Sequence, residues 1–291
     1  MQTKVIVKVL GTAQDGGVPH PNCSCEHCQL SDHRPELRRL ASSLAIILPD
    51  LKKWHLVDAT PDMREQLTFL KRSHPELGLM DSVLLTHAHI GHYTGLMFLG
   101  KEVISTKHLP VYAGQEMQDF LASHAPWKQL VDLQNINLES IWPDEVLVLD
   151  NAVKVTPLQV PHRNEYAKTF GFVISGKVKK LLYIPDIDRW EQWDRDLQEI
   201  SSSVDYCLVD GTFFSEQELT DAGRDYKHIP HPLMSTTMDL LANLVQNSKT
   251  KVYFTHFNHT NPAVNPDSDV TAMIRSKGFE IAEEGMEFQL S

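Results

Sequence analysis

Thr86-His87-Ala88-His89-Ile90-Gly91-His92 contains three histidines and directly follows the apolar run Ser82-Val83-Leu84-Leu85. His87 and His89 are two residues apart, so in an extended segment both rings project to one side. Gly91 allows the sharp turn that brings His92 round to the same place. Neutral imidazole is a good ligand for Zn, Fe, Mn and Ni. This stretch therefore predicts a transition-metal site at the end of a strand.

A second metal signature lies near the N-terminus, in Cys23-Ser24-Cys25-Glu26-His27-Cys28, which holds three of the four cysteines. In a reducing cytosol such clustering indicates a metal site rather than disulfides. Three thiolates can bind a structural zinc that takes its fourth ligand from elsewhere. Nearby His20, His27 and His33 are all candidates for that ligand. Cys207, in an apolar run, is instead expected to be a small core residue.

Composition restricts the class of function. The chain has 291 residues, 42% of them hydrophobic and 22% charged, as in an ordinary globular protein. Its net charge is −11, and no basic stripe is present for a phosphate backbone, so we expect a small-molecule substrate and no nucleic acid. Residues 1–11 alternate like a strand, and no run of 18 apolar residues occurs, so we expect a cytoplasmic protein without a membrane partner. A homodimer is left open.

Strand and helix patterns alternate along the chain. The residues from Gly11 to Pro35 are expected to be irregular and held by their metal. Helices are predicted at 61–73 with Thr60 as N-cap, near His92, and at 115–124, 190–200 and 235–247. Strands are predicted at 4–10, 43–48, 54–57, 82–85, 111–113, 146–149, 153–160, 170–174, 181–184, 206–209 and 252–254. This order predicts an α/β fold with helices on the outer faces of the sheets, as one domain over 1–291 made of two similar halves.

Metal-binding residue types recur where predicted strands end. Ligands placed at successive strand ends can converge on one rim of a sheet, which scattered surface histidines would not do. The residues in such positions are His87, His89, His162, Asp186 and His256.

These residues resemble the metallo-β-lactamase superfamily, whose signature is His-x-His-x-Asp-His followed by a His, an Asp and a final His on later strands. The resemblance implies an αββα sandwich. It also implies a first metal held by His87, His89 and His162, and a second held by His92 and His256, with Asp186 bridging the two. Gly91 stands where the superfamily has its aspartate. A Gly91→Asp substitution is therefore expected to increase occupancy of the second site.

Two families within this superfamily are closer in sequence motifs. The stretch from Leu10 to Pro19, with Asn22-Cys23-Ser24-Cys25 and Asp210-Gly211-Thr212, resembles pyrroloquinoline quinone (PQQ) biosynthesis protein B. The Cys-x-Cys-x-x-Cys loop with Thr255-His256-Phe257-Asn258-His259 is more similar to the cyclic phosphodiesterase of phosphonate breakdown. That second resemblance implies that His259 is the fourth ligand of the zinc held by Cys23, Cys25 and Cys28. It also implies that His231 is the active-site histidine that meets the substrate.

The expected function is a metal-dependent hydrolase that acts on a small anionic ester or phosphodiester through a metal-activated water. It would use a structural Zn and one or two active-site divalent metals, Zn, Mn or Fe. Asp186 would bridge or orient the attacking group, and His231 would stabilise charge or protonate the leaving group. One alternative is an iron-dependent oxidation step in PQQ biosynthesis. Another is a non-catalytic carrier or binding protein of that pathway. The presence of Gly91 in place of the signature aspartate favours this alternative.

Overall fold

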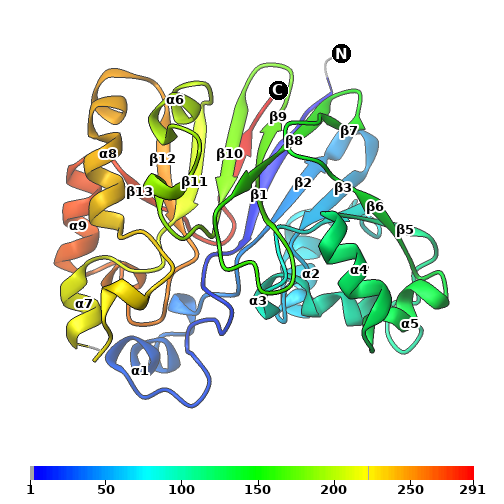
Figure 1. The fold of residues 1–291 in the computed structure, drawn as a ribbon, viewed down its shortest axis with the longest axis horizontal. Coiled ribbons are helices and arrows are strands. Elements are labelled where there is room, and N and C mark those ends of the chain that lie inside the picture. Colours follow the sequence, from blue (N-terminus) through cyan, green and yellow to red (C-terminus); the bar gives the residue numbers. More distant parts are fainter. Residues whose placement is uncertain (1–2, 222) are drawn as a thin grey trace.

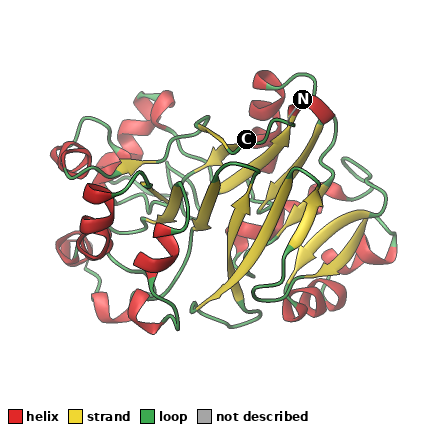
Figure 2. Ribbon diagram, turned by 90° about the horizontal axis from the view of Figure 1, so that it is seen from above, coloured by secondary structure: helices red, strands yellow, loops and turns green. Residues whose placement is uncertain are grey.

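Two mixed β-sheets face each other at the centre of the computed structural model, which describes residues 3–221 and 223–291, and helices cover their outer faces (Figure 1). Seen from above, the strands form the middle of the molecule and most helices lie outside them (Figure 2). The predicted αββα sandwich is confirmed. The domain predicted over 1–291 includes residues 1, 2 and 222, which lie outside the described residues.

The two sheets have the same design. The first has the order β14 (Glu287–Gln289), β1 (Ile6–Gly11), β2 (Ser43–Leu48), β3 (Lys53–Val57), β4 (Ser82–Leu84), β5 (Leu109–Ala113) and β6 (Ile136–Ser140). The second has the order β13 (Glu280–Ile281), β12 (Lys251–Thr255), β11 (Tyr206–Asp210), β10 (Lys180–Ile184), β9 (Thr169–Ser175), β8 (Val153–Val160) and β7 (Leu147–Asp150). In each sheet four neighbouring strands are parallel, β3 to β6 and β10 to β13, and the rest pair antiparallel. Parallel strands bring their carboxyl ends to one edge, which is where ligands bind in such sheets.

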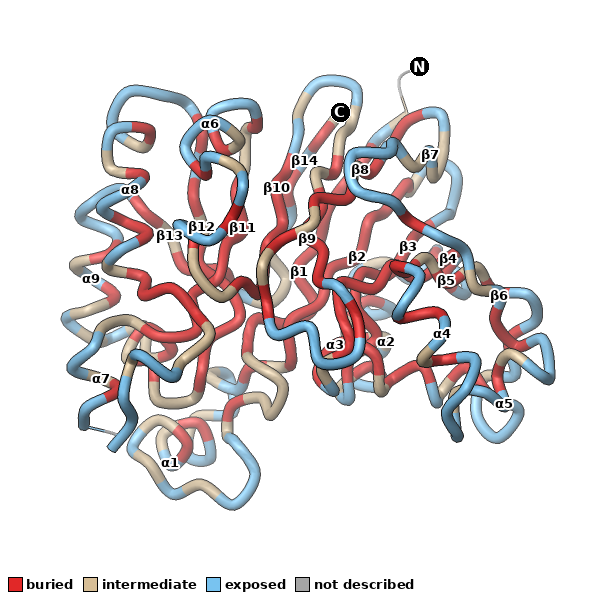
Figure 3. The backbone as a smooth tube through the Cα atoms, viewed as in Figure 1, coloured by how far each residue is buried: buried red, intermediate tan, exposed pale blue. Residues whose placement is uncertain are grey.

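Alternation of side chains along the strands produces three apolar layers. In the first strand, Val7 and Val9 point between the sheets, whereas Ile6 and Leu10 point toward the helices of the first half. Because both faces of β1 and β2 are covered, these two strands are buried throughout their length (Figure 3).

The helices are divided between the two outer faces. Met63 and Met117 from two of them pack on the first sheet, and Met238 and Ile274 from two others pack on the second. The helices are α1 (Glu26–His33), α2 (Met63–Ser73), α3 (Ile90–Tyr93), α4 (Gln115–Ser123), α5 (Trp127–Asp132), α6 (Leu197–Ser202), α7 (Glu216–Asp221), α8 (Met234–Asn247) and α9 (Asp269–Ser276). None of the described helices is both long and apolar enough to cross a membrane.

Three of the predicted elements need correction. The segment from Gly11 to Pro35 is not wholly irregular, because α1 begins directly after Cys25. Helix α2 begins at Met63, and the Thr60 hydroxyl instead accepts a hydrogen bond from the amide of Asp62. The helix predicted over 190–200 is wrong at its start. A 3₁₀ turn covers Trp190–Gln192, and α6 begins only after Asp196, whose carboxylate accepts hydrogen bonds from the next helical amides.

Candidate metal centre

Three histidines and one aspartate meet at the carboxyl edge of the sheets. His87 and His89 follow β4, His162 follows β8, and Asp186 follows β10. The Nδ1 atom of His89 lies 2.9 Å from Nε2 of His87 and 3.2 Å from Nε2 of His162. The two carboxylate oxygens of Asp186 lie 3.3 Å from Nε2 of His87 and 3.2 Å from Nε2 of His162. These spacings are those of atoms that share one metal ion, for which metal–ligand distances of about 2.0–2.2 Å are usual.

In each ring, the inner nitrogen is the one that faces the centre, and the outer nitrogen is the one that points away from it. Oxygen atoms of neighbouring side chains lie close to the outer nitrogens. The Nδ1 atom of His87 is 3.0 Å from the Thr86 hydroxyl, which itself donates to the buried carboxylate of Asp58. The Nδ1 atom of His162 is 2.8 Å from Oδ1 of Asp188. A ring whose outer nitrogen donates a proton presents the lone pair of its inner nitrogen to the centre. The tautomers that metal binding requires are therefore set by neighbouring side chains.

The charges around Asp186 favour a cation. Burial alone would raise the pKa of Asp186, but His162, His231 and His256 hold it well below its usual range, so the carboxylate is ionised. Burial would lower the pKa of His162, yet Asp186 and Asp188 raise it to about 10. The buried, ionised carboxylate therefore needs a positive partner, which a metal ion at this place would supply.

His92 and His256 form the adjacent part of the centre. The Nδ1 atom of His92, in α3, lies 2.8 Å from Oδ2 of Asp58. The Nδ1 atom of His256 lies 3.0 Å from the Thr212 hydroxyl, and its Nε2 atom lies 3.7 Å from Asp186. Burial lowers the pKa of His256 to about 4, so its ring is neutral. Asp58 and His256 both adopt positive φ, 63° and 64°, at the ends of β3 and β12, as strained residues at functional sites often do.

Buried polar atoms that lack a hydrogen-bond partner indicate whether a metal ion would fit this centre. The Oδ1 atom of Asp186 and the Nε2 atom of His256 are buried and make no hydrogen bond with the described residues. Buried polar atoms are normally satisfied, and a lone pair left unpaired costs about 1–3 kcal/mol. Both atoms face the group of histidines, so a metal ion at this place would satisfy them. The His and Asp groups of this centre are suited to metal binding.

His231 lies in the wall of a pocket of about 130 Å³ beside these residues. Its Nδ1 atom is 2.8 Å from Oδ2 of Asp210, the last residue of β11. Burial would lower the pKa of His231, but Asp210 and Asp186 raise it. Two arginines, Arg163 and Arg224, line the same pocket. The pocket thus combines a proton donor with positive charge.

The cysteine motif forms a separate group with His259. The Nδ1 atom of His259 lies 3.4 Å from the Sγ atoms of Cys23 and Cys25 and 3.6 Å from Sγ of Cys28. A tetrahedral zinc with bonds of about 2.3 Å to sulfur and about 2.0–2.1 Å to nitrogen would give separations of about 3.6 Å. Burial lowers the pKa of His259 to about 4, so the ring is neutral.

The nearby candidates for the fourth ligand occupy other places. The group that the three thiols form within the described residues is completed by His259 and not by His20, His27 or His33. His20 contributes only its amide, which lies 3.3 Å from Sγ of Cys28. Cys207 is fully buried in β11, as expected for a core residue, and burial raises the pKa of its thiol to about 12.

Several residues that position the histidines were not predicted from the sequence as part of the site. These are Asp58, Asp188, Asp210 and Thr212. A signal was present, because Asp58 and Asp210 directly follow apolar runs, as Asp186 does, and all three lie at the carboxyl edge of a sheet.

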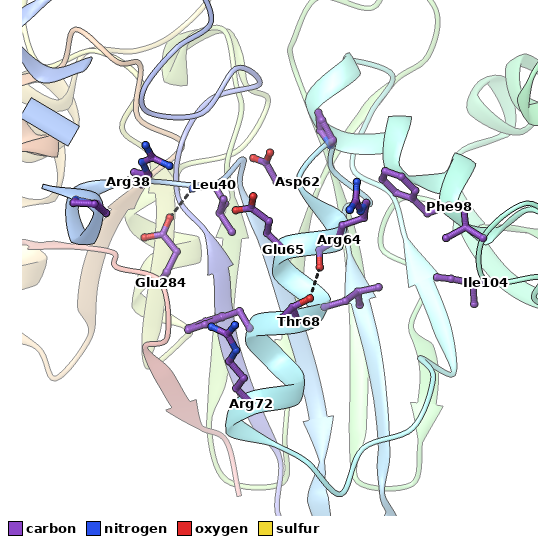
Figure 4. Close-up of a pocket in the computed structure, with 15 residues that line it drawn as sticks. Arg38, Leu40, Asp62, Arg64, Glu65, Thr68, Arg72, Phe98, Ile104 and Glu284 are labelled. Atoms are coloured by element: carbon purple, nitrogen blue, oxygen red, sulfur yellow. Dashed lines mark hydrogen bonds between the residues drawn. The ribbon is translucent and has the colours of Figure 1, made fainter. Parts of the chain in front are cut away.

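A cavity of about 940 Å³ lies elsewhere, beside α2 (Figure 4). Arg38, Arg64 and Arg72 line it together with Asp62, Glu65 and Glu284, but no described histidine or cysteine does. The much smaller pocket at His231 is the candidate site because ligand atoms, proton donor and positive charge meet there.

Comparison with known proteins agrees with this geometry. Residues 53–257 match the family model described as β-lactamase superfamily domain, and the chain belongs to that superfamily. It is similar over almost its whole length to coenzyme PQQ synthesis protein B. The protein of that name from Methylorubrum extorquens strain PA1 is 30% identical over 306 residues, covering 98% of this chain and 99% of the relative. The one from Methylobacterium sp. strain 4-46 is 29% identical over 305 residues, covering 97% and 99%.

Solved structures agree on the fold. Zn(2+)-bound PqqB from Methylobacterium extorquens superposes with a TM-score of 0.82 at 26% identity and covers 97% of this chain and 99% of that one. A diphosphatase from the PhnP family superposes with a TM-score of 0.71 at 22% identity, covering 99% and 98%. The second likeness concerns the fold alone.

Proposed function

We propose that this chain is a metal-dependent hydrolase that acts on a small anionic ester or phosphodiester. One observation carries the proposal. The inner nitrogens of His87, His89 and His162 converge on the ionised carboxylate of Asp186, while protein oxygens hold the outer nitrogens. Membership of a superfamily that is generally hydrolytic and metal-dependent supports the same conclusion.

The metal would be held by His87, His89, His162 and Asp186, with His92 and His256 beside them. When bound, a divalent metal of this kind supplies a hydroxide near neutral pH, because it lowers the pKa of its water toward about 7. Being ionised, Asp186 would accept a hydrogen bond from the attacking group and so orient it. The buried surroundings of Asp186 strengthen that interaction.

His231 is suited to act as general acid on the leaving group. Its Nδ1–H donates to Asp210, which fixes the ring, and its side chain lines the pocket. Arg163 and Arg224 line the same pocket and would attract an anionic substrate. Loss of the proton from His231 to a leaving alkoxide would leave a neutral ring beside Asp210, ready to be protonated again from solvent.

A second candidate function rests on the full-length similarity to coenzyme PQQ synthesis protein B. The chain would then perform an oxidation step of that pathway with iron, or serve it as a non-catalytic carrier. A three-histidine, one-carboxylate group also suits non-haem iron. Metal analysis of protein made without added metal separates the cases. Substantial iron would favour oxidation, and about one zinc per chain, held by the cysteines, would favour the carrier.

The direct test is hydrolysis of bis(4-nitrophenyl) phosphate by protein loaded with Zn, Mn or Fe. We expect turnover that is lost in His89→Ala and kept in His124→Ala, a matched change of an exposed histidine at the end of α4. Equal activity of His89→Ala and the unchanged protein would refute the proposed site. No turnover of this diester or of simple carboxylic esters with any of the three metals would refute the hydrolase.

A further inference from the structure

Asp15 lies where a side chain of residue 91 would otherwise be. A Cβ atom built on Gly91 would fall 2.0 Å from Oδ1 of Asp15 and 2.7 Å from its Cα atom. Real Cβ atoms essentially never approach other heavy atoms so closely, and the three nearest atoms, Oδ1, Cα and Cγ, all belong to Asp15. Glycine at 91 is therefore what admits Asp15 to this place.

Backbone hydrogen bonds hold the loop that carries Asp15. The amide of Gln14 donates to the carbonyl of Phe257 at 2.9 Å, and the amide of Phe257 donates to the carbonyl of Thr12 at 2.8 Å. Ala13 forms a bridge with the same Phe257. Since Phe257 directly follows His256, the loop is attached to the segment that carries a member of the centre. The position of Asp15 relative to His256 is thus set by main-chain pairing.

Within the described residues, no hydrogen bond accounts for the position of the Asp15 carboxylate. Its Oδ1 atom is buried and makes no hydrogen bond with the described residues. It lies 3.7 Å from Nε2 of His92, which is too long for a hydrogen bond. Nε2 of His256 is likewise buried without a partner. Ligand atoms of Asp15, His92 and His256 all lie within 4.8 Å of one another.

We propose that Asp15 is the carboxylate ligand of a second divalent metal, which it binds together with His92 and His256. The inference deepens the proposed function, because it concerns the metal centre on which that function rests. A carboxylate brought from the N-terminal loop takes the part that the superfamily signature gives to residue 91. Two imidazoles and one carboxylate are a usual ligand set for Zn, Mn or Fe. The Asp186 carboxylate, 3.7 Å from His256, adjoins this group.

This arrangement reverses one expectation from the sequence. Gly91→Asp alone is not expected to improve the second site, because its Cβ atom would collide with Asp15. Asp15→Gly would not make room for it, because the Asp15 Cα atom itself lies 2.7 Å from that Cβ atom.

The test is metal binding and does not need turnover. Metal-free protein is titrated with Mn(II) or Co(II) and followed by electron paramagnetic resonance or visible absorption, with metal content measured by mass spectrometry. We expect Asp15→Ala and Asp15→Asn to weaken the second equivalent at the histidine centre at least about 10-fold. Gly91→Asp should weaken it too, because its Cβ atom collides with both the side chain and the Cα atom of Asp15. Asp132→Ala, which removes an exposed carboxylate paired with Lys128 in the same helix, is the matched control and should change nothing.

Two results would overturn the inference. One is unchanged binding of the second equivalent in both Asp15 variants. The other is a histidine centre that takes up a single metal even in the unchanged protein, a result that leaves a one-metal hydrolase intact. Conversely, loss of the second metal in Asp15→Ala without any hydrolysis by the unchanged protein would support the ligand and refute the hydrolase.

Discussion

Oδ2 of Asp210 lies 2.8 Å from Nδ1 of His231, and both side chains are buried beside Asp186. Asp210 also accepts hydrogen bonds from the amides of Ile187 and Thr212, so its carboxylate is held rigidly. One residue at the end of β11 therefore fixes both the orientation and the protonation of the ring that lines the pocket. It also ties that ring to the segment after β10.

The first prediction concerns this pair. Burial would lower the pKa of His231, and Asp210 is the largest factor that raises it. Asp210→Asn removes the charge, so the pKa of His231 should fall. A general acid works only while it is protonated. As the pH is raised, the variant should therefore lose activity at a lower pH than the unchanged protein does. We expect kcat to decrease by about 10²-fold at neutral pH, measured as a pH profile. An unshifted profile with full activity would contradict the role of His231 as acid.

The second prediction concerns Asp188, whose Oδ1 atom accepts a hydrogen bond from Nδ1 of His162. Asp188→Asn weakens the interaction that orients the ring toward the metal. We expect the affinity of the first metal to fall by about 10–100-fold, measured by competition with a chelating dye. Asp194→Asn is the control, because Asp194 is exposed and makes only a long contact with Arg195. Equal affinities in all three proteins would show that the tautomer of His162 is set elsewhere.

The third prediction concerns structural zinc. Cys25→Ser removes one of three thiols around His259, and zinc bound to native structure contributes to folding free energy. We expect the loss of about one zinc per chain and a decrease of about 2–4 kcal/mol in the free energy of unfolding, or about 5–10 °C in Tm. Cys207→Ala changes a core cysteine outside the group and should keep the zinc. Unchanged zinc and Tm in Cys25→Ser would exclude the site.

Proton release gives a fourth prediction for the same site. Burial and the neighbouring thiols raise the pKa of Cys28 to about 12 in the absence of metal, so its thiol is protonated at neutral pH. Zinc binds the thiolate, so binding must release protons. Calorimetric titration of the metal-free protein in buffers of different ionisation enthalpy should report about two to three protons per zinc. A value of zero would mean that zinc binds elsewhere.

The fifth prediction concerns Glu218 in α7, which accepts hydrogen bonds from the Thr260 hydroxyl and the Phe214 amide. Burial raises the pKa of its carboxyl to about 7 from 4.5. The folded protein therefore binds more protons than the unfolded chain between these values, and stability falls as pH rises from about 4.5 through 7. We compare the free energies of unfolding of Glu218→Gln and the unchanged protein. Between pH 4 and pH 8 their difference should shift by about 1–3 kcal/mol in favour of the variant.

Urea unfolding at both pH values measures this effect. Glu216→Gln, a matched change of an exposed glutamate in the same helix, is the control and should alter neither value. A constant difference between Glu218→Gln and the unchanged protein across this pH range would show that Glu218 is not buried as described.

Local patterns in the chain were enough to predict the α/β class, the two groups of metal-binding residue types and the strands other than β6, β13 and β14. The reason is that side-chain alternation and residue chemistry are properties of short segments. His87 and His89 share a strand end, and Cys23, Cys25 and Cys28 share a loop, so their spacing reports their proximity directly. The αββα sandwich followed from the family resemblance.

Contacts between distant segments were decided only by the tertiary structure. Asp58, Asp188 and Asp210 take part because they lie beside histidines from other strands. The apolar runs before Asp58 and Asp210 do not show which histidines these carboxylates meet. Asp15 is the clearest case. Its place at Gly91 depends on the pairing of its loop with Phe257, more than two hundred residues later. The sequence alone therefore determined which residue types were available for the metal centre, and the packing of the two halves determined which of them reach it.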